Sequence, residues 1–172
     1  GHADFCFDEK YGFRDYRGGG RSSGRETIGR VAAGAIAVKM LSGLGIKFLT
    51  YTRSIGPVTI NEVNFDAHEI YNNSLYMPDA DAALKASEYL EECLKSLNSS
   101  GGVCECVITG LPVGLGDPVF EKIDANLAKA IMSIGAVKGF EIGDGFDAAG
   151  ATGLTNNDAF IMRDGAVSKE TN

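Results

Sequence analysis

The sequence has no apolar run long enough to cross a bilayer and no segment with the pattern of a secretory signal peptide. These absences predict a cytoplasmic protein without a membrane partner. Positive charge is also in short supply, because 16 lysines and arginines face 23 aspartates and glutamates, giving a formal net charge of −7. A surface of that sign repels the phosphates of nucleic acids, so nucleic acid is not an expected partner.

Metal-binding side chains are few. The chain has two histidines and four cysteines, and no histidine stands at a chelating distance along the sequence from a pair of cysteines. We therefore expect no metal site. Cys104 and Cys106 lie two residues apart in an expected strand, so they share one face, and we predict that they are buried thiols. His68 lies among polar residues and is expected on the surface.

The basic residues that are present gather near the start of the chain. Between residues 10 and 30 there are six basic and two acidic residues, a local charge of +4 in an otherwise acidic protein. Arg17–Arg21 is a glycine-rich loop with an arginine at each end, and Ser23 and Glu26 have the spacing of a capping box that begins a helix. Free amides at such a helix start, with arginines beside them, favour an oxyanion.

We interpret this stretch, residues 10–30, as an anion site and call it the basic island. The alternative is a mobile loop whose arginines pair with the surplus carboxylates. A Walker-type nucleotide site is excluded here, because no Gly-Lys-Ser or Gly-Lys-Thr follows the loop. RNA binding through a single Arg-Gly-Gly-Gly-Arg motif is a further alternative, but the motif is weak evidence in an acidic protein.

Hydrophobic periodicity predicts an α+β fold with antiparallel pairing. The expected helices cover residues 24–44, 78–97 and 117–135. The expected strands cover residues 46–54, 57–63, 103–111 and 136–142. The first helix is so poor in charge that we expect it to be buried between other layers.

The remaining segments are expected to be less regular. Residues 1–21 should be extended and loop-like, residues 64–76 irregular, and residues 147–172 flexible. The whole chain is then predicted to form a single domain with its core in residues 24–146.

The sequence also resembles the chorismate synthase family over almost its full length. Six blocks carry the resemblance in the family's order: His2–Asp4, Arg14–Thr27, Arg30–Ala37, Gly114–Phe120, Ala130–Gly139 and Glu141–Phe146. Two positions depart from the pattern, because Gly24 stands where alanine is commoner and Gly135 where asparagine is usual. The family's opening Gly-x-Ser-His-Gly segment and its carboxy-terminal half have no counterpart, so the chain resembles a central fragment that should be inactive alone.

The resemblance implies a fold in which helices are sandwiched between antiparallel sheets, here incomplete, and a homotetramer for the full-length protein. It implies a lyase of the shikimate pathway, which supplies aromatic amino acids. That enzyme eliminates phosphate from 5-enolpyruvylshikimate 3-phosphate in a 1,4-anti sense and forms chorismate. The family requires reduced FMN without net redox change, and NADPH only where a flavin reductase activity is present.

Carried over by position, the resemblance also implies site residues. Arg21, Ser22 and Ser23 match flavin contacts of the family, and so do Gly135 and Ala136, where Gly135 contacts through backbone only. Arg25 matches an arginine that binds the substrate. His2 matches the catalytic histidine placed near the flavin, whose near-neutral titration suits a group that gives and retrieves a proton. The alternative is a non-catalytic module that binds phosphate or flavin.

Overall fold

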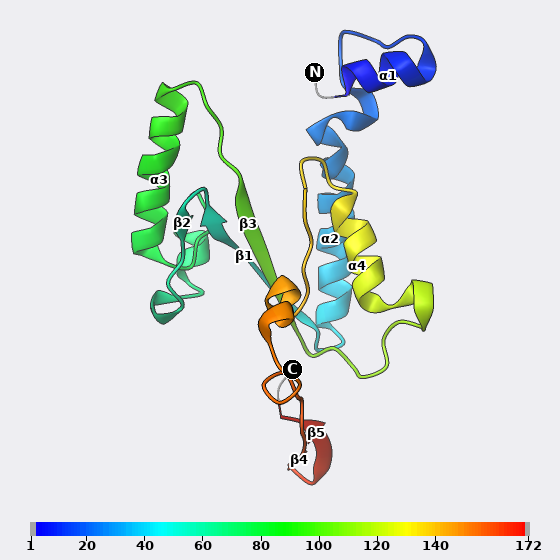
Figure 1. Ribbon diagram of the computed structural model, residues 1–172, viewed down its shortest axis with the longest axis vertical. Coiled ribbons are helices and arrows are strands. Elements are labelled where there is room, and N and C mark those ends of the chain that lie inside the picture. Colours follow the sequence, from blue (N-terminus) through cyan, green and yellow to red (C-terminus); the bar gives the residue numbers. More distant parts are fainter. Residues whose placement is uncertain (1–2, 171–172) are drawn as a thin grey trace. The chain divides into compact units, whose positions relative to one another are not determined.

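The computed structural model describes residues 3–170 (Figure 1). Two compact units can be distinguished: the first combines the described residues up to Gly29 with those from Gly114 onward, and the second is Arg30–Val113. The chain thus leaves the first unit within a helix and returns to it after the second. The single domain expected from the sequence stays a prediction, and each unit is described by itself below.

The second unit is built on a small antiparallel sheet. Its strands are β1 (Lys47–Ile55), β2 (Val58–Thr59) and β3 (Gly102–Thr109), in the order β2-β1-β3. Helix α3 (Ala80–Lys95) packs against β2. The buried core combines strand, helix and connecting residues: Tyr51, Ile60, Ile70, Met77, Ala82, Ala83 and Ala86. The antiparallel pairing is confirmed, and α3, β1 and β3 lie within two residues of their predicted bounds. The strand predicted over 57–63 is only two residues long.

The connection between β2 and α3 is irregular, as expected. It contains two short 3₁₀ turns, Glu62–Asn64 and Glu69–Tyr71, and His68 between them is exposed. Two polar side chains organise this segment. Asp79 is almost fully buried and Asn73 is partly buried, and both bond mainly to backbone groups. A long connection without regular structure is thereby held in one conformation.

Helix α2 (Thr27–Ser42) begins three residues later than expected and has no buried residue. Ile28, Val31 and Ile36 are each about two-thirds exposed, at 67%, 71% and 65%. The charge-poor sequence predicts layers that cover this helix, and residues 3–170 leave it exposed. Large exposed apolar side chains on one helix are unusual for a complete soluble domain.

Two parts of the first unit differ from the sequence-based prediction. Residues expected to be extended form helix α1 (Asp4–Tyr11), which has an acidic residue in its first turn, a basic one in its last and ends at Gly12 with φ of 77°. These are the charges and the left-handed glycine that favour a helix. The predicted helix over residues 117–135 is shorter, consisting of a 3₁₀ turn, Val119–Glu121, followed by α4 (Ile123–Met132).

The predicted strand over residues 136–142 is wrong, since this segment is irregular. A run of alternating residues becomes a strand only where a second strand bonds to it. The last described part of the chain, expected to be flexible, contains a hairpin of β4 (Phe160–Arg163) and β5 (Ala166–Lys169). Asp164 and Gly165 form its turn with φ of 52° and 78°, a signal of a tight hairpin that the sequence contains.

Tyr51 provides a pH-dependent test of the second unit. Burial, then the negative charge of Glu105 and a hydrogen bond to it, raise the pKa of Tyr51 to about 12. Because the folded-state pKa lies above the unfolded value near 10, the stabilisation is complete below pH 10 and is lost as pH rises through 12. We expect the unfolding free energy to fall by about 2 kcal/mol more in the parent chain than in Tyr51→Phe over that range.

Urea titrations of both chains at neutral and alkaline pH measure this difference. Equal losses in the two chains would mean that Tyr51 ionises as easily in the folded protein as in the unfolded one.

Candidate anion-binding site

The loop after Arg17 leads into α2 through two short 3₁₀ turns, Gly20–Ser22 and Gly24–Glu26. Ser23 lies between them in an extended conformation, and its Oγ accepts a hydrogen bond from the amide of Arg25 at 3.3 Å. Ser23 is therefore the cap that the sequence predicts, although its partner is the amide of Arg25. The carboxylate of Glu26 is instead bound by the guanidinium of Arg21 at 2.8 Å.

Four backbone amides at this helix start, those of Ser22, Ser23, Arg25 and Glu26, are occupied, which corrects in part the expectation that they are free. The amides of Ser22, Ser23 and Glu26 donate to the carbonyls of Gly19, Gly20 and Ser23 at 3.0, 3.1 and 3.0 Å. Short 3₁₀ turns close i to i+3 bonds and so use amides that a direct α-helix start would leave free. These four amides cannot donate to an anion, so side chains gain weight as its donors here.

The serine hydroxyls differ in what they can still donate. Ser22 Oγ donates to the carbonyl of Gly19 at 2.6 Å, which uses its hydrogen inside the loop. Ser23 Oγ acts as an acceptor in its cap, so its hydroxyl hydrogen remains available to an incoming oxyanion. Of the two predicted serine contacts, Ser23 thus has the donor for a phosphate oxygen.

Carboxylates in or just before the basic island pair with three of its arginines. Arg17 holds Asp15 through two guanidinium nitrogens at 2.9 and 3.0 Å, and hydrogen bonds from the side chain and the amide of Arg17 lower the pKa of Asp15. Arg14 lies 3.2 Å from Asp8 and 3.5 Å from Asp4. With the pair between Arg21 and Glu26, much of the island's charge is balanced locally, as the alternative interpretation anticipates.

Arg25 differs from these three arginines. Its guanidinium makes no hydrogen bond or ion pair with any residue between 3 and 170, and the side chain is exposed. It projects from the turn that starts α2, where the helix dipole favours negative charge. An uncommitted guanidinium in that position is suited to a bidentate grip on a phosphate or carboxylate.

Gly135 and Ala136 follow the end of α4 and belong to the same unit as the loop. No hydrogen bond in the described part of the chain joins either of them to Arg21, Ser22 or Ser23. A methyl group added to Gly135 would meet no atom within 4 Å, so the missing side chain leaves open space. The two groups of predicted flavin contacts are thus not joined by hydrogen bonds among residues 3–170. His2 lies outside the described residues.

Ala136 has a backbone conformation that alanine rarely adopts, with φ of 71°. The left-handed region costs a non-glycine residue roughly 1–2 kcal/mol, and glycine removes this strain from the folded state. Glycine also raises the backbone entropy of the unfolded chain, which offsets part of the stabilisation. We expect Ala136→Gly to raise the free energy of unfolding by about 0.5 kcal/mol and Ala136→Val to lower it by roughly 1 kcal/mol.

Urea unfolding measures both changes. Ala130→Gly inside α4 is the matched control, and there the same substitution should destabilise by about 1 kcal/mol. Loss of stability in Ala136→Gly as well would contradict a strained Ala136.

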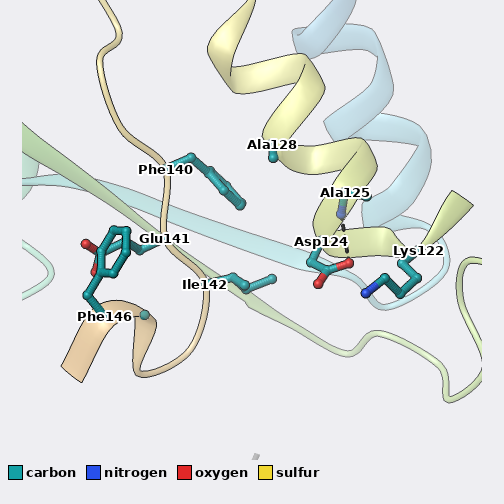
Figure 2. A pocket seen from close by; sticks show the side chains of 9 residues that line it. Lys122, Asp124, Ala125, Ala128, Phe140, Glu141, Ile142 and Phe146 are labelled. Atoms are coloured by element: carbon teal, nitrogen blue, oxygen red, sulfur yellow. Dashed lines mark hydrogen bonds between the residues drawn. The ribbon is translucent and has the colours of Figure 1, made fainter. Parts of the chain in front are cut away.

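A separate open cavity of about 390 Å³ lies within the first unit, between the start of α4 and the segment that follows it (Figure 2). Its lining is mainly apolar, with one lysine and two carboxylates at the edge: Lys122, Asp124, Ala125, Ala128, Phe140, Glu141, Ile142, Gly145 and Phe146. Figure 2 shows Phe140 directed toward Ala128, and Ile142 toward Asp124. None of the predicted site residues lines it. Sequence reasoning missed this cavity, although the aromatic residues flanking the glycines of 143–145 mark it.

Further features of the described residues concern metal-ligating clusters, cysteines and helix length. No group of three metal-ligating side chains occurs among residues 3–170. Cys93 is buried, but Cys104 and Cys106 are exposed, so their predicted burial is wrong in this chain. They lie on the sheet beside Thr52 and Thr50, without a cover on that side. No helix in the described part of the chain is long and apolar enough to cross a membrane.

Comparison with known proteins gives a consistent result. The family model described as chorismate synthase matches residues 1–172. A curated relative named chorismate synthase from Agathobacter rectalis is 96% identical over 100% of this chain and 47% of the relative. Another of that name, from Methanosarcina mazei, is 48% identical over 100% of this chain and 48% of the relative. A solved structure titled "Crystal Structure of Chorismate Synthase" matches at TM-score 0.87 and 32% identity, over 99% of this chain and 55% of that one. The chain spans about half the length of the curated relatives it matches.

Proposed function

The chain belongs to the chorismate synthase family, and we propose that it supplies the phosphate-binding arginines and serine of an enzyme that forms chorismate. In this proposal the longer protein eliminates phosphate from 5-enolpyruvylshikimate 3-phosphate in the shikimate pathway, as a lyase without net redox change. Bound reduced FMN would supply the electron density that helps the phosphate leave. The fold, with helices and antiparallel sheets, matches that of the family.

The observation that carries the proposal is the uncommitted guanidinium of Arg25, next to the Ser23 cap at the start of α2. The substrate carries a phosphate and two carboxylates, and FMN adds a second phosphate. Because the amides of Arg25 and Glu26 in this turn are occupied, cationic side chains would balance most of that charge. Arg25 would hold the substrate, and Arg21 together with the Ser23 hydroxyl would hold the flavin phosphate.

The donor set of the loop fits a phosphate, since guanidinium and hydroxyl groups are what phosphate oxygens accept from. Ser22 would act indirectly, by holding the loop closed through its bond to Gly19. Gly135 and Ala136 would offer only backbone groups to the flavin, and His2 would exchange a proton beside it. We further propose a homotetrameric full-length enzyme in the cytoplasm, which needs NADPH only if it reduces its own flavin.

The test uses a chimeric polypeptide, in which these 172 residues replace the matching 47% of the Agathobacter rectalis chorismate synthase. Arg25→Ala should lower kcat/KM for 5-enolpyruvylshikimate 3-phosphate by about 100-fold or more, because a charged hydrogen-bonding partner of a phosphate is lost. Arg25→Lys keeps the charge but not the bidentate grip and should recover part of this loss. Arg163→Ala, in the β4–β5 hairpin, is the matched control and should turn over like the parent.

Three outcomes are informative. Parental turnover in Arg25→Ala would overturn the role of that residue. A chimera that binds FMN and phosphate but forms no chorismate would favour a non-catalytic binding module. A chimera that binds neither would overturn the proposed function as a whole.

A further inference from the structure

Glu26 is the carboxylate that faces the basic island from the turn preceding α2. Its Oε1 accepts a hydrogen bond from the Nη1 of Arg21 at 2.8 Å, and the side chain of Arg21 is otherwise 90% exposed. Glu26 itself is only 37% exposed and sits at the last position of the Gly24–Glu26 turn. The more fixed member of the pair is therefore the carboxylate, and the guanidinium is held by it.

From this geometry we propose that Glu26 is a positioning residue, which orients the guanidinium of Arg21 toward an anionic phosphate. The inference rests on the proposed function, because it names a residue that prepares the same site. Guanidinium offers five N–H donors, and the bond to Glu26 uses one nitrogen. The remaining donors stay available, and their direction is fixed by the rigid planar fork.

A purely structural role for the pair is a weak explanation. Ion pairs between side chains as exposed as Arg21 contribute little to stability, because solvent screens them and two long side chains must be immobilised. The same loop contains a comparable exposed pair between Arg17 and Asp15, at 2.9 Å. If Glu26 only balanced charge, the two pairs would be equivalent, and neither would affect a ligand specifically.

Charge and orientation predict opposite effects, which makes the inference testable. Removing a negative charge beside an anion site should tighten binding of a phosphate if Glu26 acts only through its charge. Removing the partner that orients Arg21 should weaken binding even though the site becomes more positive. The sign of the change in affinity therefore distinguishes the two roles.

The experiment measures FMN dissociation constants by flavin fluorescence in the chimera described above, for the parent, Glu26→Ala, Glu26→Gln and Arg21→Ala. We expect Glu26→Ala to weaken FMN binding about tenfold, a typical loss for a supporting hydrogen-bond partner. Glu26→Gln, whose amide oxygen still accepts from Arg21, should lie between Glu26→Ala and the parent. In an Arg21→Ala background, Glu26→Ala should have no further effect, because the residue that it positions is gone.

Asp15→Asn is the matched control, since it removes the charge of the other exposed pair without touching the partner of Arg21, so it should not weaken FMN binding and can only tighten it through charge. Thermal unfolding of each variant keeps affinity separate from folding, and the melting temperature should barely move in Glu26→Ala. Tighter or unchanged FMN binding in folded Glu26→Ala, with Arg21→Ala still weakened, would overturn the positioning role and leave the proposed function standing. Loss of FMN binding in the parent chimera would instead count against the proposed function.

Discussion

Asp79→Ala is expected to lower the free energy of unfolding by about 3 kcal/mol, roughly a hundredfold in the equilibrium. Asp79 is only 3% exposed, and its carboxylate bonds in two directions. Oδ1 accepts from the amides of Asp81 and Ala82 at 3.0 and 3.1 Å, which caps α3. Oδ2 accepts from the amide of Asn61 at 2.9 Å, so the same side chain anchors the irregular segment after β2.

The expected size follows from adding two different losses. A missing N-cap costs about 1 kcal/mol, and a partly buried amide that loses its charged acceptor, here that of Asn61, costs roughly 1–2 kcal/mol. Both losses destabilise the same hydrophobic core, because Asp79 links the start of α3 to Asn61, the neighbour of the buried Ile60.

Urea unfolding of the parent and variant chains measures the effect. Asp81→Ala is the matched control, because Asp81 is an exposed carboxylate in the same helical turn and its loss should change stability by less than about 0.5 kcal/mol. Similar losses in both variants would mean that Asp79 acts only through the helix dipole, as any first-turn carboxylate does.

The ionisation of Asp79 gives a second readout of the same contacts. Burial by itself would raise the pKa of Asp79, but hydrogen bonds from the amides of Asn61, Ala82 and Asp81 outweigh burial and lower it. A depressed folded-state pKa means that the stabilisation is present above the unfolded value near 3.9 and is lost as pH falls below it. The stability difference between the parent and Asp79→Ala should therefore shrink in acid.

The sequence predicted the second unit well, because its elements are long and strongly patterned. The strand β1 alternates and β3 is mostly apolar, and both lie between glycines. Helix α3 has the expected length, although alanines form its buried face while Leu84 and Leu94 are 63% and 74% exposed. In the first unit, local signals were weaker or were read wrongly. Helix α1 has almost no apolar face, so only its end charges and Gly12 indicate it. The segment over residues 136–142 has the alternation of a strand but no partner strand.

At the candidate site, too, residue spacing predicted some contacts and not others. Spacing alone predicted Ser23 as a cap, and the structure places it there. It could not predict that 3₁₀ turns would use the amides of Ser22 and Glu26, or that Glu26 would bind Arg21 instead of reaching back along the helix. Both outcomes depend on loop geometry, which a capping-box pattern does not specify.

Asn73→Ala is expected to cost about 2–3 kcal/mol of unfolding free energy, although Asn73 is only partly buried and contacts no ligand. Its side-chain amide donates to the carbonyls of Glu69 and Met77 at 2.7 and 2.8 Å. Its carbonyl accepts from the amides of Leu75 and Met77 at 3.2 Å each. All four bonds close the loop that delivers Met77, which is fully buried, to the core.

The charged isostere sharpens this prediction. Asn73→Asp keeps both acceptor contacts, but it removes the two donors and sets a carboxylate against the carbonyl oxygens of Glu69 and Met77. The introduced carboxyl should therefore have a raised pKa, so its penalty is small in acid, where the protonated group can donate, and grows as pH rises past about 4. Asn72→Ala is the control, because exposed Asn72 bonds only Glu69 Oε1 with its side chain, at 3.2 Å, and its loss should cost under about 0.5 kcal/mol. Urea unfolding from pH 3 to 7 measures all three variants, and a penalty for Asn73→Asp that does not change with pH would contradict the proposed carbonyl contacts.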